Sequence, residues 1–124
     1  MAVRFIKIAV VYFVIGVLLG LYMSMAHDYA LKGVHVHINL LGWASFALAG
    51  IIYHLFPSSS NNMYAKLHFW SGNIGLPVMM IALTVLILNG AEVATVFTAI
   101  GGVLVVFSVI MFAINVFMNV RSTN

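Results

Sequence analysis

Four long apolar stretches constrain this chain more than any other feature of its sequence. They cover residues 5–25, 34–56, 67–88 and 93–118. Each reaches the ~20 residues that an α-helix needs to cross about 30 Å of hydrocarbon. In lipid the backbone must satisfy its own hydrogen bonds, and the period-two alternation of a membrane β-barrel is absent. The sequence therefore predicts an all-α fold, with residues 1–124 forming one integral membrane four-helix bundle.

The composition excludes several other classes of protein. The 124 residues are 65% hydrophobic and 6% charged, whereas a soluble domain of this size carries roughly 25% charged residues. Intrinsic disorder needs the opposite balance. The net charge is +3, but the five lysines and arginines are scattered and form no patch for nucleic acid. The chain has no cysteine, so it lacks disulfides, thiolate metal sites and the attachment motif of c-type haem.

The segments between the apolar stretches have the composition of turns. Residues 28–33 are expected to form a short polar hairpin. Residues 57–62 are expected to form a loop, with Pro57 ending the second helix. In the last connection, Gly90 is expected to cap the third helix and Glu92 to favour the start of the fourth.

The basic residues predict how the chain is oriented in the membrane. Four crossings place both termini and the 57–62 loop on one side, which carries four of the five basic residues: Arg4, Lys7, Lys66 and Arg121. Only Lys32 lies on the other side. Because cytoplasmic segments carry the excess of Lys and Arg, we expect both termini in the cytoplasm of a bacterial or archaeal cell.

Aromatic residues and the N-terminal stretch add two further expectations. Residues placed near the two membrane interfaces fit aromatic belts: Tyr22, Tyr29, Tyr53, Tyr64 and Trp70.

The basic start of the chain, its apolar run and Ser24-Met25-Ala26 also resemble a secretory signal peptide with a cleavage site. The apolar run is long for that role, so we expect a retained helix.

Histidines are the main candidates for chemistry in this chain. On the predicted topology His27, His35 and His37 lie toward the outer face, and His54 and His68 lie toward the cytoplasmic face. The two groups are separated by most of the bilayer, so one metal ion cannot join them. We expect His27 to be a solvated loop residue and His54 and His68 to be polar anchors or ligands.

His35 and His37 lie within the second apolar stretch, where ionisable groups are rare and usually functional. Residues two apart on a helix point about 200° apart. The two imidazoles therefore cannot chelate one ion, and each needs its own partner. Both could be neutral histidines bonded to backbone carbonyls near the helix end, or both could be ligands.

The second apolar stretch resembles a helix of a known family. It contains the run HINLL at 37–41, Trp43, and the run AGIIYHLFP at 49–57. This order and spacing resembles the second transmembrane helix of the nitric oxide reductase large subunit, a member of the haem–copper oxidase superfamily. Residues 68–77, which contain HFW and NIGLP, loosely resemble the next helix of that superfamily.

The resemblance implies a haem b site. In the family the first histidine of the motif is an axial ligand of the low-spin haem, and that role falls here on His37. The sequence His35-Val36-His37 also resembles a family motif in which two histidines ligate different haems from opposite faces. The resemblance thus makes His37 and His35 the expected haem-iron ligands.

The chain also departs from the family in ways that bear on function. The family subunit has about twelve helices in three arcs of four, so a four-helix chain could rebuild that outline as a homotrimer with haem between subunits. The copper-site motif is absent, and Asp28 and Glu92 both lie in expected loops, so no intramembrane carboxylate remains. We expect no oxidase activity from one chain on its own.

Small residues spaced four apart could support close packing of helices. Gly16 and Gly20 form one such face, and Ser45 and Ala49 form another. These faces could pack against a neighbouring subunit or within one bundle.

Three functions remain open from the sequence. The first is a small cytochrome b-like protein for electron transfer or sensing of a diatomic gas, with an unidentified redox partner. The second is a copper-handling protein, for which Met23, Met25 and His27 form the best local cluster. The third is a cofactor-free accessory subunit of a respiratory complex, in which the histidines are incidental.

Overall fold

The chain folds into helices joined by short connections. The computed structural model describes residues 1–122, and these contain helices and no strand. Four spans are long and apolar enough to cross a membrane: Ala2–Ala26, Lys32–Leu55, Met63–Asn89 and Glu92–Asn119. The predicted all-α fold and its four spans are confirmed.

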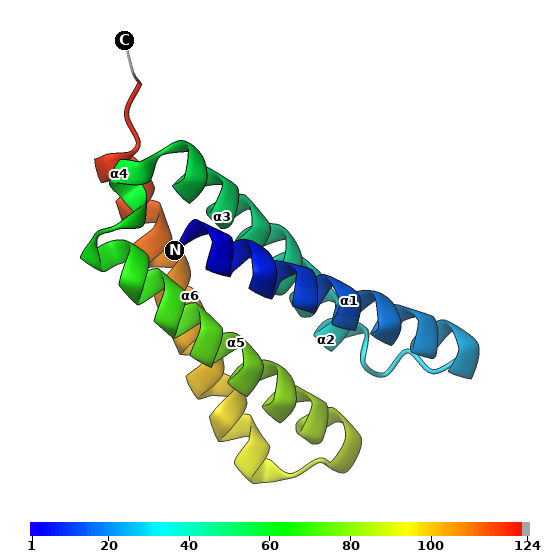
Figure 1. Cartoon of the computed structure of the whole chain (residues 1–124). Coiled ribbons are helices and arrows are strands. Elements are labelled where there is room, and N and C mark those ends of the chain that lie inside the picture. Colours follow the sequence, from blue (N-terminus) through cyan, green and yellow to red (C-terminus); the bar gives the residue numbers. More distant parts are fainter. Residues whose placement is uncertain (123–124) are drawn as a thin grey trace.

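The spans are arranged as two antiparallel hairpins (Figure 1). Helix α1 (Ala2–Ala26) packs along the second span, and α5 (Met63–Asn89) packs along α6 (Glu92–Asn119). The hairpins come together near the end that holds both termini, and they diverge toward their two turns.

We expected one regular helix over residues 34–56, but the second span is divided into three helical segments. It consists of α2 (Lys32–His37), the π-helix η1 (Ile38–Ser45) and α3 (Phe46–Leu55). The hydroxyl of Ser45 donates to the carbonyl of Leu40, five residues earlier, at 2.7 Å. The wide turns of a π-helix are rare, and they often lie near functional sites.

The connection at 57–62 is more ordered than the loop that its composition predicts. Pro57 begins a single helical turn, α4 (Pro57–Ser60), where its missing N–H costs nothing. The side-chain oxygen of Asn62 accepts from the backbone N–H of Ala65 at 2.9 Å and caps α5. Because of this cap, α5 begins at Met63 rather than near residue 67.

The connection between α5 and α6 follows the prediction. Gly90 has a φ of 65°, the left-handed conformation that caps a helix C-terminus. Glu92 lies in the first turn of α6, where the helix dipole favours a negative charge.

Glycines allow the helices within each hairpin to approach closely. A Cβ added at Gly101 of α6 would lie 2.5 Å from the backbone nitrogen of Met79 in α5. In the other hairpin, a Cβ at Gly16 would lie 2.6 Å from the side chain of Asn39, and one at Gly20 would lie 2.9 Å from the ring of His35. The Gly16/Gly20 face therefore packs within the chain.

We predict that Gly101→Ala destabilises the α5–α6 hairpin by about 1–3 kcal/mol, because the added methyl would force the two backbones apart. Gly102→Ala is the matched control, since its Cβ would lie 3.6 Å from the sulfur of Met79, an ordinary contact. Thermal unfolding of the two variants in detergent micelles measures the difference in their stability. Equal loss of stability in both variants would contradict the close approach at Gly101.

Candidate functional site

His37 ends α2, and its exposed imidazole has one nitrogen held by the backbone. Nδ1 lies 2.7 Å from the carbonyl oxygen of Gly33, one turn earlier. A carbonyl can only accept, so Nδ1 carries the proton and Nε2 keeps its lone pair. Histidines that ligate metals usually donate their other ring N–H in this way, which sets the tautomer and the ring orientation.

His37 lies at an apolar groove between the second span and the α5–α6 hairpin. The groove has a volume of about 650 Å³, within the roughly 300–1,000 Å³ typical of ligand and cofactor sites. His37 contributes the only polar side chain to its lining, which otherwise consists of Leu41, Met79, Ala99, Gly102, Val103, Val105, Val106, Val109 and Ile110. This combination of a single imidazole and apolar walls fits a haem iron and its porphyrin.

His35 faces the other way, toward α1. Its half-buried ring places Nδ1 2.9 Å from the carbonyl oxygen of Gly16, so Nδ1 donates and Nε2 has no hydrogen-bond partner among the described residues. The side-chain amide of Asn39 donates to the backbone carbonyl of His35 at 2.9 Å. The two histidines lie on different faces of α2, as their spacing predicts.

The remaining outer-face candidates do not converge on a site. His27 is exposed and forms the left-handed cap of α1, with a φ of 49°. Met23 is 5% exposed and Met25 is 75% exposed, so the two thioethers lie on different faces. Within residues 1–122, no group of three or more His, Cys, Asp or Glu residues could hold a metal ion.

The buried centre of the molecule contains a histidine whose environment the sequence did not reveal. His68 of α5 is 4% exposed, and its Nδ1 lies 2.8 Å from the hydroxyl of Tyr53 in α3, which is 1% exposed. Phe5 of α1 stacks on the imidazole, with ring centroids 4.7 Å apart. Tyr53 is thus a core residue and not part of the interfacial belt that we expected. The helical spacing of Phe46, Ala49 and Tyr53, all buried, is the signal that could have placed it.

Asn115 of α6 connects this pair to the connection at residues 57–62. Its side-chain nitrogen donates to the backbone carbonyl of Ser59 at 2.8 Å and to the hydroxyl of Tyr53 at 3.4 Å. Its side-chain oxygen accepts from the amides of Asn62 at 2.7 Å and Asn119 at 2.8 Å. The Asn115 side chain is fully buried, and its bonds to Ser59 and Tyr53 are buried as well.

A comparison of the chain with protein-family models, curated proteins and solved structures finds no match. The resemblance of residues 37–57 to the haem–copper oxidase superfamily therefore stays a prediction.

We predict that Asn115→Ala destabilises the protein by about 1–3 kcal/mol, because it removes the four hydrogen bonds that this fully buried side chain makes to Tyr53, Ser59, Asn62 and Asn119. Asn61→Ala is the control, since Asn61 is an exposed residue of the same type. Thermal unfolding in the same detergent compares the two variants. A loss for Asn115→Ala no larger than that of the control would show that the buried network contributes nothing to stability.

Proposed function

We propose that the chain is a small membrane cytochrome b-like protein, related to subunit I of the haem–copper oxidases, with His37 as an axial ligand of haem b. The observation that carries the proposal is the geometry of His37. The Gly33 carbonyl holds Nδ1, and the Nε2 lone pair is left for a metal beside an apolar groove of about 650 Å³. The motif at 37–57 supports the same residue independently of the geometry.

The proposal takes the second axial ligand from a neighbouring chain. His35 faces α1 and cannot reach the iron that His37 of the same chain holds. His35 of another subunit has an unbonded Nε2, and three four-helix chains would match the twelve-helix outline of the family. The sequence resemblance is the main support for His35, because its ring is half-buried against Gly16. The proposed assembly is a homotrimer with both termini in the cytoplasm.

The proposed activity is electron transfer. A haem iron with two axial imidazoles supplies one-electron redox chemistry and has no position open for a gas. His37 would hold and orient the group, and the apolar walls of the groove would exclude water from it. Five-coordinate iron, with His37 as the sole ligand, would instead leave a position for a diatomic gas.

We predict that the purified protein, expressed with sufficient haem, shows sharp reduced α and β bands in a reduced-minus-oxidised visible spectrum. His37→Ala should lose these bands, whereas His54→Ala should keep them, because His54 is exposed and lies at the other end of the span. A colourless wild-type protein would contradict the haem proposal and favour a cofactor-free accessory role. If the colourless protein instead binds copper, and mutation of Met23 and Met25 removes the bound copper, the result would favour copper handling.

The intersubunit ligand has its own test. We predict that the haem-loaded protein has the mass of three chains in native mass spectrometry, and that His35→Ala converts six-coordinate low-spin iron to five-coordinate high-spin iron in resonance Raman spectra. A monomer that keeps fully ligated low-spin haem would contradict the trimer, and an unchanged spectrum in His35→Ala would contradict the role of His35.

A further inference from the structure

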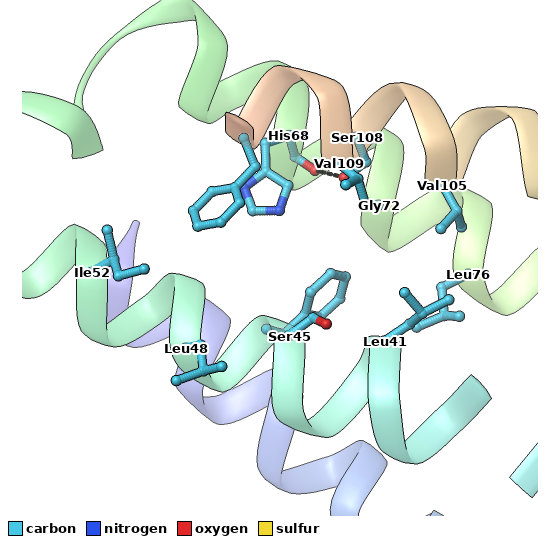
Figure 2. Close-up of a pocket in the computed structure, with 12 residues that line it drawn as sticks. Leu41, Ser45, Leu48, Ile52, His68, Gly72, Leu76, Val105, Ser108 and Val109 are labelled. Atoms are coloured by element: carbon cyan, nitrogen blue, oxygen red, sulfur yellow. Dashed lines mark hydrogen bonds between the residues drawn. The ribbon is translucent and has the colours of Figure 1, made fainter. Parts of the chain in front are cut away.

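A second cavity lies between the second span and the α5–α6 hairpin, nearer than the His37 groove to the end that holds both termini (Figure 1). It has a volume of about 290 Å³, and it shares Leu41, Val105 and Val109 with that groove. Figure 2 shows the imidazole of His68 pointing into it. Neither the proposed haem site nor the sequence analysis gives this cavity a role.

A chain of hydrogen bonds determines which nitrogen of His68 carries the proton. The carbonyl of Ser59 can only accept, so the atom of Asn115 beside it is the amide nitrogen. That nitrogen also donates to the oxygen of Tyr53, so among residues 1–122 the only hydrogen-bond partner of the hydroxyl that can accept its proton is Nδ1 of His68. Neutral His68 therefore carries its own proton on Nε2, and Nε2 has no partner within residues 1–122.

The N–H of His68 is the only side-chain donor that the cavity offers a ligand. The hydroxyl of Ser108 donates to the backbone carbonyl of His68 at 2.7 Å, and that of Ser45 donates to the carbonyl of Leu40. All other lining side chains are apolar. His68 is 4% exposed, so a hydrogen-bond acceptor placed in the cavity would meet a donor that water rarely reaches.

The lining also indicates the size of the ligand and how it arrives. Leu48 and Val109 at the cavity are 59% and 49% exposed on faces that the membrane would cover, so entry is from the hydrocarbon. Phe46 and Phe112 provide aromatic walls. An apolar cavity of about 150 Å³ binds benzene, and this one is about twice as large, which suits two fused rings.

We propose that this cavity binds a lipid-soluble quinone of naphthoquinone size, with one carbonyl oxygen accepting a hydrogen bond from Nε2 of His68. The apolar walls hold the rings, and the single N–H selects a carbonyl compound over a hydrocarbon of the same shape. The site uses His68 and not His37, so its hydrogen bond does not depend on the proposed haem ligand, although the two spaces share Leu41, Val105 and Val109.

The test is equilibrium binding of radiolabelled menadione to the full-length protein in lipid nanodiscs, with empty nanodiscs subtracted. Its matched ligand control is 2-methylnaphthalene, which has the same rings and no carbonyl. We expect saturable binding of menadione that is about tenfold tighter, as one hydrogen bond in a desolvated site allows. His68→Leu should remove this preference, and His54→Leu should keep it.

A variant at the mouth of the cavity keeps the test decisive if His68→Leu does not fold. Val109→Trp places a large side chain at the lipid-facing edge and leaves the hydrogen-bonded residues intact, and it should weaken both ligands at least tenfold. Equal affinity of the wild type for the two ligands would overturn the proposal, as would unchanged binding in Val109→Trp. Loss of the haem bands in His68→Leu, with the bands kept in His37→Ala, would make Nε2 an iron ligand and overturn both proposals.

Discussion

The structure depends on a buried hydrogen-bonded group, Asn115, Tyr53 and His68, together with Phe5 stacked on His68. These four residues come from four different spans. A polar group left unpaired in hydrocarbon costs several kcal/mol, about 2–7 depending on the reference. Because Tyr53, His68 and Asn115 bond to one another across the second, third and fourth spans, satisfying them holds these three spans in one arrangement, and the stacking of Phe5 adds α1. The two hairpins meet at the end of the molecule that holds both termini. The cavity beside His68 and the groove beside His37 lie between the hairpins, on the side toward their turns (Figure 1).

Two histidines on neighbouring cavities are held in opposite tautomers by their partners. His37 faces a backbone carbonyl, which can only accept, so its free nitrogen has a lone pair. His68 faces a tyrosine hydroxyl whose proton has no other acceptor among its partners in residues 1–122, so Nδ1 accepts and the free nitrogen has a proton. The first suits a metal ion and the second suits a carbonyl oxygen. One residue type thus presents two chemistries, which is the reason we assign two different ligands to spaces that share part of their lining.

Hydropathy and turn chemistry predicted most of the fold because they act locally. A run of apolar residues must be helical in lipid whatever surrounds it, and Gly90 caps α5 through its own backbone freedom. The π-helical turns of η1 were not predicted, since residues 38–45 contain no proline and have the composition of an ordinary apolar helix. The early start of α5 was also missed, because the cap at Asn62 was hidden in a run that has the composition of a loop.

The sequence by itself determined that this chain has four membrane-length helices, that His35 and His37 lie on different faces of one of them, and where the turns fall. These properties follow from composition and from helical geometry, which need no partner. Only the tertiary structure decided that His68 and Tyr53 are buried together, that Gly16 and Gly20 receive Asn39 and His35, and which nitrogen each histidine presents. Those outcomes depend on groups far apart in the chain meeting in space, and no local pattern encodes such a meeting.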